Sequence, residues 1–209
     1  MDSAVNAMEL PCAMALVGMP GAGKTLCADH LRRRGYPGFR FGQIVVDEVE
    51  RRGLARTQDS ERIVREDLRA LQGREAIARL ALPLLRQLLQ TSPVIFIDGL
   101  YSFSEYQLLR RELDASLLVV AIVSARQRRY RRLGQRPQRP LDAAAAEARD
   151  LREITTLEKG GPIAIADHTL LNDGTPAALT GALDSLLRHL GLDSRTIPAE
   201  GGNSCKSRL

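Results

Sequence analysis

Short runs of consecutive apolar residues alternate along this chain with stretches in which apolar residues recur every three or four positions. The runs are typical of strands buried on both faces of a sheet, and the spaced stretches are typical of amphipathic helices. The predicted strands are residues 13–17, 39–41, 94–97, 117–123 and 169–171. The predicted helices run from Thr25 to Gly35 and then over residues 43–52, 60–72, 73–90, 104–112, 125–133, 141–158 and 175–190. Strands that alternate with helices predict an α/β fold with a parallel sheet.

Two local signals modify this pattern within the domain, and the composition of the last residues sets its C-terminal end. Pro83 is expected to kink or divide its helix near Leu82, and the run from Lys159 to Pro162 is typical of a helix end. The last residues are polar, with glycines and no periodicity, which indicates a disordered tail. We therefore expect an N-terminal extension, a folded domain and a C-terminal tail at residues 1–9, 10–190 and 191–209.

Length and composition indicate an ordinary globular domain. The 209 residues, of which 44% are hydrophobic and 26% charged, are enough for a core without disulfides. The longest apolar run, 117–123, is far shorter than the roughly twenty residues that span a bilayer. The first six residues carry an acid and no Lys or Arg, unlike a signal peptide, so a cytoplasmic location is expected. Cys12, Cys27 and Cys205 form no C-x-x-C pair, and we expect the first two in the core.

The basic character of the chain is local. The formal net charge is +5, but seven arginines and no acid lie between Asp114 and Asp142, and without those seven the charge would be −2. A local arginine cluster indicates a site for an anion, most often phosphate, as readily as a nucleic-acid surface. Almost no aromatic residues accompany these arginines, so binding of RNA or DNA is not favoured.

Residues 18–25 read Gly-Met-Pro-Gly-Ala-Gly-Lys-Thr and match G-x-x-x-x-G-K-[ST] at every fixed position. They follow an apolar strand and precede a helix, as a phosphate-binding loop requires. The glycines let backbone N–H groups curl around an anion, and the helix directs its positive end to the same place. Lys24 would reach the outer phosphates of ATP, and Thr25 would hold Mg²⁺. The residues expected to bind the nucleotide here are Gly18, Gly21, Ala22, Gly23, Lys24 and Thr25.

The rest of the sequence excludes some classes of protein that have this phosphate-binding loop, or P-loop. The chain has no Asn-Lys dipeptide, which guanine-reading GTPases need. Strand 94–97 ends in Asp98-Gly99, whereas AAA-type and RecA-type ATPases commonly have Asp-Glu there. Asp98 can position Mg²⁺ or accept a proton, but efficient ATP hydrolysis is not expected.

The arginine cluster would supply the charge that phosphoryl transfer requires. Arginines that close over the transferring group neutralise its oxygens and exclude water. We place a mobile lid at residues 132–142, with Arg132, Arg136 and Arg139 directed at the phosphates, and take Arg128 and Arg131 as solvated surface.

These features resemble the nucleoside-monophosphate-kinase-like P-loop kinases, most closely dephospho-CoA kinase and its uncharacterised relatives. The resemblance is carried by residues 18–25, 41–43, 98–102, the arginine lid and 166–174, which is similar to an A-D-x-x-[IL]-x-N-x-G segment. It implies a three-layer sandwich with a five-stranded parallel sheet, ATP at the strand ends, and an acceptor pocket formed by helices within residues 43–90. It also implies that Asn172 and Gly174 lie near the adenine.

One position departs from the resemblance. Dephospho-CoA kinases have an aspartate just after the second strand, whereas this chain has Gln43. Asp47, one helical turn later, could reach the same space, or Asp98 could act as the base. An acceptor that is already an ionised phosphate needs no base. Three arginines near the acceptor helices are possible ligands for such an anion: Arg40, Arg56 and Arg65.

The sequence thus predicts an ATP- and Mg²⁺-dependent phosphotransferase for a small nucleotide-like acceptor, with Lys24, Asp98, Arg132, Arg136 and Asp47 as catalytic candidates. Thr25 and Asp98 are the predicted Mg²⁺ ligands. The alternative is a regulatory module that binds ATP, turns it over slowly and acts through a protein partner.

Overall fold

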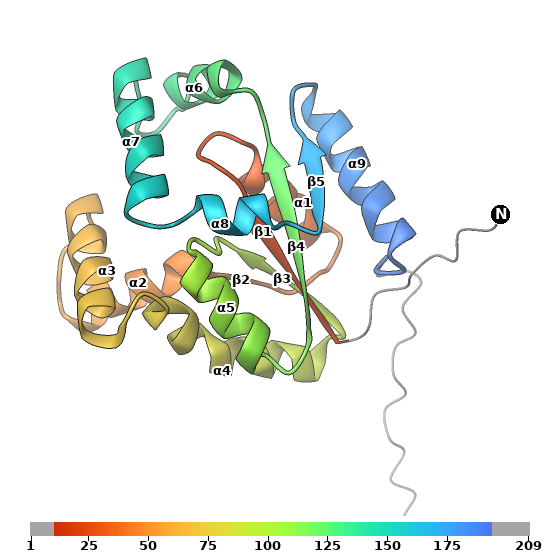
Figure 1. The fold of residues 1–209 in the computed structure, drawn as a ribbon, viewed down its shortest axis with the longest axis horizontal. Helices are drawn as coiled ribbons and strands as arrows, with labels where there is room; N and C mark the ends of the chain where they lie inside the picture. Colours follow the sequence, from red (N-terminus) through yellow and green to blue (C-terminus); the bar gives the residue numbers. More distant parts are fainter. Residues whose placement is uncertain (1–10, 194–209) are drawn as a thin grey trace, which may run out of the picture.

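The computed structural model of the chain describes residues 11–193, which form a five-stranded parallel sheet flanked by helices (Figure 1). The strands are β1 (Cys12–Val17), β2 (Gly38–Arg40), β3 (Val94–Asp98), β4 (Ser116–Val123) and β5 (His168–Leu171). Their order in the sheet is β2-β3-β1-β4-β5, and every neighbouring pair is parallel. The predicted α/β three-layer fold and the positions of all five strands are confirmed.

Successive strand residues point to opposite faces of the sheet, so each face builds its own core. On one face Ala13, Ile95 and Val119 pack with buried residues of the helices on that side. On the other face Met14, Phe96 and Val120 pack against α1 and α9. Because both faces are covered, every residue of β1 is buried, which explains why the strands are continuous apolar runs.

The helices agree with the predicted segments, with two exceptions. They are α1 (Lys24–Arg33), α2 (Phe41–Arg51), α3 (Gln58–Gln72), α4 (Ala76–Thr91), α5 (Phe103–Glu112), α6 (Arg126–Gly134), α7 (Ala143–Thr155), α8 (Gly160–Ala164) and α9 (Pro176–His189). The expected division near Leu82 is wrong, because α4 runs unbroken through Pro83 with Leu82 and Leu85 buried on either side. The predicted helix 141–158 ends before Lys159, at Thr155, but Gly160 then begins the short helix α8, which was not predicted.

The described chain stays packed beyond the predicted end of the domain. Leu192 is buried, and its carbonyl accepts a hydrogen bond from the Tyr36 hydroxyl at 2.7 Å. Asp193 pairs with Arg34 at 2.8 Å. The folded part thus reaches at least residue 193, which corrects the expected boundary at 190. The predicted extension at 1–9 and the remainder of the predicted tail lie outside the described residues.

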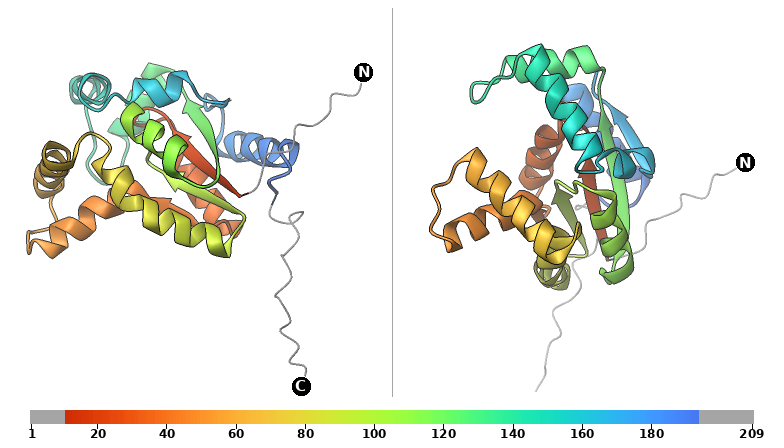
Figure 2. Two further views of the ribbon diagram at one scale, coloured as in Figure 1. Left: turned by 60° about the horizontal axis from the view of Figure 1, so that its bottom comes forward. Right: turned by 60° about the vertical axis from the view of Figure 1, so that its left-hand side comes forward.

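Two helical arms project beyond the carboxyl ends of the strands (Figures 1 and 2). One arm consists of α2 and α3, which follow the short strand β2, and the other consists of α6 and α7, which follow β4. The loop between β1 and α1 lies between the two arms. In open parallel sheets, ligands bind at this end of the strands.

Candidate functional site

The loop between β1 and α1 has a backbone that only glycine accommodates at three positions. Gly18, Gly21 and Gly23 have φ angles of 143°, 78° and 114°. Space is restricted as well: a Cβ on Gly18 would lie 2.3 Å from the Ile122 carbonyl oxygen, and one on Gly21 would lie 2.7 Å from that of Arg129. The glycines therefore serve the close packing of the loop against β4 and α6 as well as its curvature.

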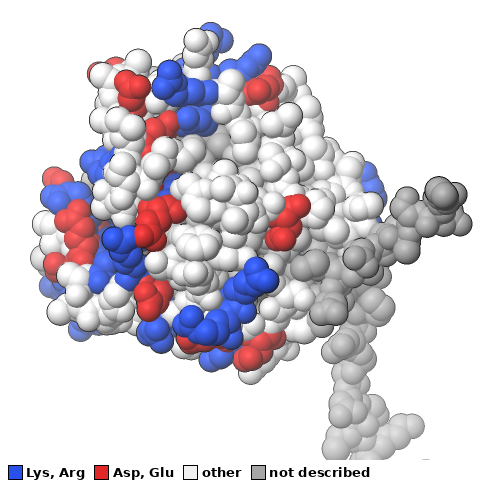
Figure 3. All heavy atoms as spheres, in the orientation of Figure 1, with Lys and Arg blue, Asp and Glu red and all other residues white. Residues whose placement is uncertain are grey.

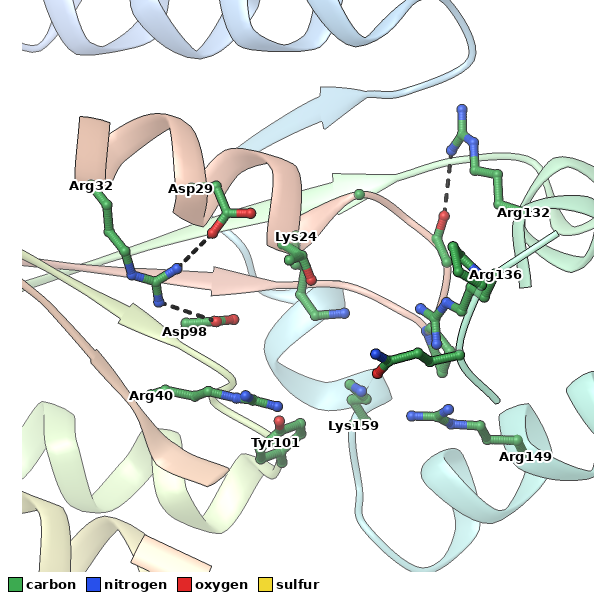
Figure 4. Close-up of a pocket in the computed structure, with 16 residues that line it drawn as sticks. Lys24, Asp29, Arg32, Arg40, Asp98, Tyr101, Arg132, Arg136, Arg149 and Lys159 are labelled. Carbon is green, nitrogen blue, oxygen red and sulfur yellow. Dashed lines mark hydrogen bonds and ion pairs between the residues drawn. The ribbon is translucent and has the colours of Figure 1, made fainter. Parts of the chain in front are cut away.

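A cavity of about 810 Å³ opens above this loop (Figure 4). It is lined by Pro20, Gly21, Gly23, Lys24, Thr25, Asp29, Arg32, Arg40, Asp98, Tyr101, Arg132, Arg136, Pro137, Gln138, Arg149 and Lys159. Seven of these side chains are cationic and two are carboxylates, so their formal charges sum to +5. Such a charge distribution is suited to a ligand that carries several negative charges.

Lys24 lies at the centre of the cavity. Its ammonium group donates to the carbonyl oxygens of Gly18 at 2.6 Å and Met19 at 3.2 Å. Desolvation by burial and the neighbouring cation of Lys159 lower the pKa of Lys24 to about 7. The side chain is therefore held by neutral loop oxygens, and within residues 11–193 no carboxylate is in hydrogen-bond contact with it. An anion that approaches would favour its charged form.

Thr25 and Asp98 both line the cavity and present the oxygen groups that Mg²⁺ prefers. Thr25 is exposed at the first turn of α1, and Asp98 is the last residue of β3. Arg32 lies 3.7 Å from Asp98 and 2.8 Å from Asp29 (Figure 4). Among the described residues, the one ion pair of Asp98 is this long contact with Arg32. The predicted role of Asp98 as a Mg²⁺ ligand stays a prediction. The described residues include no cluster of three or more His, Cys, Asp and Glu side chains that could hold a metal by itself.

The wall opposite α1 contains two cations that the sequence analysis did not assign to the site. Lys159 is only 2% exposed, pairs with Glu153 and lies 5.0 Å above the Tyr101 ring. Arg149 donates to the same carboxylate at 3.0 Å. Both cations line the cavity, and Glu153 orients them. One available signal was that Lys159 is one of only three lysines in the chain.

The three predicted lid arginines have different surroundings. Arg136 lines the cavity, and burial lowers its pKa. Arg132 also lines the cavity, but its guanidinium points away from the centre (Figure 4). It donates to the Asn172 carbonyl at 2.7 Å. Arg139 is exposed, has a φ of 55° and is not among the lining residues. Arg128 and Arg131 are exposed, as predicted.

Asn172 and Gly174, expected near the adenine, do not line the cavity. Asn172 is 5% exposed, and its side-chain amide donates to the carbonyl oxygen of Ala22 at 2.7 Å. Asn172 therefore contacts the back of the phosphate-binding loop. Gly174 is exposed in the turn before α9.

The candidate base on α2 is also outside the cavity. Asp47 is exposed, and one of its oxygens accepts a hydrogen bond from the Gln43 side chain at 2.7 Å. Of the three arginines proposed for an acceptor anion, Arg40 lines the cavity and Arg56 pairs with Glu50 at 3.6 Å on the surface. Arg65 is half-buried on α3, and burial lowers its pKa.

The arginine-rich segment does not form a continuous basic surface. Arg129 is buried, Arg126 approaches Glu147 at 3.6 Å, and Arg128 approaches Asp173 at 3.8 Å. On the face drawn in Figure 3, basic and acidic side chains are interleaved. This arrangement gives no support to a nucleic-acid surface.

Cys12 and Cys27 are free and buried, as predicted, whereas Cys205 lies outside the described residues. Among the described helices, none is both long and apolar enough to cross a bilayer.

The parallel sheet and the glycine loop at its centre define a P-loop kinase-like protein. Solved structures support the fold: the crystal structure of TT1252 from Thermus thermophilus has a TM-score of 0.64 at 22% identity, covering 87% of this chain and 99% of that one. A shikimate kinase from Bacteroides thetaiotaomicron has a TM-score of 0.54 at 15% identity, covering 85% of this chain and 98% of its own.

Sequence relatives give the family. The family described as AAA domain matches residues 14–155. A UPF0200 protein of Thermococcus gammatolerans is 36% identical over 163 residues, which are 77% of this chain and 85% of that protein. A UPF0200 protein of Thermococcus sibiricus is 31% identical and covers 87% of this chain and 97% of its own length. The chain belongs to this AAA domain family and to UPF0200.

Proposed function

We propose that this protein is an ATP- and Mg²⁺-dependent phosphotransferase that acts on a small anionic, nucleotide-like acceptor of the nucleoside-monophosphate or dephospho-CoA type. The observation that carries the proposal is the cavity itself. It joins the phosphate-binding loop to cations from α1, β2, the lid and α7, and it is larger than a triphosphate alone would require. A fold shared with solved kinases supports the reaction class.

On the donor side, the loop amides and Lys24 bind the β- and γ-phosphates of ATP. Lys24 exchanges its two carbonyl contacts for phosphate oxygens, and its charged form becomes favoured as the anion approaches. Thr25 and Asp98 would hold Mg²⁺, which when bound neutralises phosphate oxygens and orients them. Arg136, next to the loop, reaches the transferring group when the lid closes.

On the acceptor side, Arg40 and Tyr101 form the wall between the phosphate loop and the α2–α3 arm. No hydrogen bond or ion pair within the described residues neutralises the Arg40 guanidinium. An anionic group on the acceptor would form an ion pair with it. Burial next to Asp98 raises the pKa of Tyr101, which keeps its hydroxyl protonated as a donor.

The transfer breaks the bond between the γ-phosphorus and the ADP oxygen and forms one to the acceptor oxygen. If that oxygen belongs to an ionised phosphate, no proton moves, and positioning with cationic stabilisation is sufficient. If it belongs to a hydroxyl, its proton goes to Asp98, because Asp47 lies outside the cavity and Asp29 is paired with Arg32.

The test is a phosphotransfer screen with purified protein, ATP and Mg²⁺ against the nucleoside monophosphates and dephospho-CoA, with ADP formation and phosphorylated product both measured. Lys24→Ala is the inactive variant, and Arg128→Ala, exposed outside the cavity, is the matched control. The proposal requires one acceptor to raise ADP formation well above the acceptor-free rate in the wild type and the control but not in Lys24→Ala.

A regulatory ATP-binding module is the second candidate. It is favoured by the pairing of Gln43 with Asp47 outside the cavity and by Gly99 in the place of a hydrolytic glutamate. ATP binding that no acceptor in the screen converts into turnover would select this candidate.

A further inference from the structure

The outer side of the phosphate-binding loop is held by buried side chains from the opposite half of the chain. Arg129 on α6 donates to the Pro20 carbonyl oxygen at 3.0 Å. Asn172, just after β5, donates to the Ala22 carbonyl oxygen at 2.7 Å. A longer contact of 3.4 Å joins Arg132 to the Gly21 carbonyl oxygen. Three consecutive loop carbonyls therefore have side-chain donors.

These contacts fix the direction of the loop amides. In a trans peptide the C=O and the following N–H point in opposite directions across one rigid plane. Holding the Pro20 and Ala22 carbonyls outward therefore turns the N–H groups of Gly21 and Gly23 to the other side. Within the described residues neither N–H donates a hydrogen bond, whereas the N–H of Ala22 is used in a turn to Met19. Gly21 and Gly23 are thus two loop amides that remain available to an anion.

The two donors are themselves rigidly supported. The Arg129 guanidinium, 7% exposed, forms a two-pronged pair with Asp150, 6% exposed, at 3.0 and 2.6 Å. Tyr130 donates to the same carboxylate at 3.3 Å. Burying a charged pair this deeply has a large desolvation penalty. The attraction between the charges offsets it only when the geometry is good and further hydrogen bonds are made. The Pro20 carbonyl is one of those further partners.

We propose that Arg129 and Asn172 are positioning residues that hold the phosphate-binding loop in its anion-binding form before any ligand arrives. They touch no ligand; they act through the amides of Gly21 and Gly23. Because Arg129 is on α6 and Asp150 is on α7, the same pair fastens the base of the lid to the loop. The inference rests on the proposed function only in that the loop binds a polyphosphate.

The experiment measures binding rather than transfer. Isothermal titration calorimetry of the full chain with Mg²⁺-ATP and with inorganic tripolyphosphate compares the wild type with Arg129→Lys and Asn172→Asp. Arg128→Lys, an exposed position on the same helix, is the matched control. Loss of one charge-assisted or buried hydrogen bond is expected to weaken tripolyphosphate binding about tenfold or more.

A second readout separates positioning from a general structural role. In ¹⁵N-resolved NMR spectra, tripolyphosphate should shift the Gly21 and Gly23 amide signals of the wild type. In Asn172→Asp the Gly23 signal should shift much less, while amide signals far from the loop keep their wild-type positions, which shows that the variant is folded. If Arg129→Lys fails to fold, Asn172→Asp decides the question alone.

The inference is overturned if folded Asn172→Asp binds tripolyphosphate like the wild type with the same amide shifts, or if the wild type binds no polyphosphate at all. Wild-type protein that binds tripolyphosphate through these amides but phosphorylates no acceptor would remove the proposed function and leave the inference standing.

Discussion

Gly23 packs against the side-chain amide of Asn172 so closely that a Cβ on Gly23 would lie 2.3 Å from Asn172 Nδ2. The two residues are far apart in the sequence, and the contact joins the start of α1 to the end of β5. Gly23 also has a φ of 114°, which disfavours any side chain. This glycine thus satisfies two separate physical requirements, one of backbone curvature and one of space.

Replacing Gly23 with alanine should therefore cost more than the same change at Gly35. Gly35 has a φ of 85° but no atom within 4 Å of its would-be Cβ, so it reports the backbone strain alone. We expect Gly35→Ala to lower the free energy of unfolding by about 1 kcal/mol, and Gly23→Ala to lower it by about 1–3 kcal/mol more through overpacking. Chemical denaturation of both variants measures the difference, and equal losses would contradict the close contact.

Binding of Mg²⁺-ATP should take up a proton at pH 8. The pKa of Lys24 is about 7 in the free protein, so its amine is largely neutral at pH 8. An adjacent phosphate favours the charged form and raises that pKa. Affinity should accordingly fall as the pH rises above about 7. Calorimetry at pH 8 in two buffers with different ionisation enthalpies measures the proton uptake. Lys24→Met should abolish most of this uptake. Equal uptake by that variant would show that another group takes up the proton.

The same pKa shift affects stability in the absence of ligand. Since Lys24 has a lower pKa folded than its usual value of 10.5, the unfolded chain binds more protons between these two values. The contribution of Lys24 to the free energy of unfolding should then rise as the pH increases from about 7 to 10.5. Denaturation of the wild type and Lys24→Met across that window isolates the effect as the difference in slope.

Arg136 and Arg139 should differ in their effect on phosphotransfer. Arg136 lines the cavity, whereas Arg139 is exposed and outside it. We expect Arg136→Ala to reduce kcat/KM at least about tenfold, the value of one charge-assisted hydrogen bond. Arg139→Ala should reduce it less than twofold. Steady-state kinetics with the acceptor found in the screen provides the measurement, and a large loss in Arg139→Ala would show that the lid closes further than its present position.

Asp98 and Asp47 offer a matched pair of carboxylates. Asp98→Asn should lower kcat by about 10² or more, because it removes the proposed Mg²⁺ ligand and the proposed proton acceptor. Asp47→Asn should leave kcat unchanged, since Asp47 is exposed and bonded to Gln43 outside the cavity. Turnover across a range of Mg²⁺ concentrations tests both variants. A loss confined to Asp47→Asn would identify Asp47 on α2, and not Asp98, as the proton acceptor.

The sheet and the phosphate-binding loop could be predicted from the sequence. The apolar runs, the glycine spacing of residues 18–25 and Asp98 at a strand end together predicted the parallel sheet, its strands and the central loop. These features are local: a buried parallel strand must be apolar along its whole length, and the loop needs glycine at fixed positions.

The direction of each lid side chain depends on tertiary packing and could not be predicted from the sequence. Arg132 and Arg136 lie four residues apart in the same basic segment and both line the cavity, yet the guanidinium of Arg132 is bonded to the Asn172 carbonyl. The difference arises because Arg132 is still on α6, whose packing against the loop and β5 sets its direction, and Arg136 follows the helix end.

The sequence by itself determined the fold class and the position of the phosphate-binding loop, because both depend on residue type at fixed spacing. Only the tertiary structure decided which cations surround the loop and which support it from behind. Lys159 and Arg149 line the cavity, and Asn172 and Arg129 donate hydrogen bonds to the loop carbonyls. Both arrangements depend on contacts between segments that are distant in the chain. Such contacts follow from how the helices pack on the sheet, which no spacing of residues along one segment records.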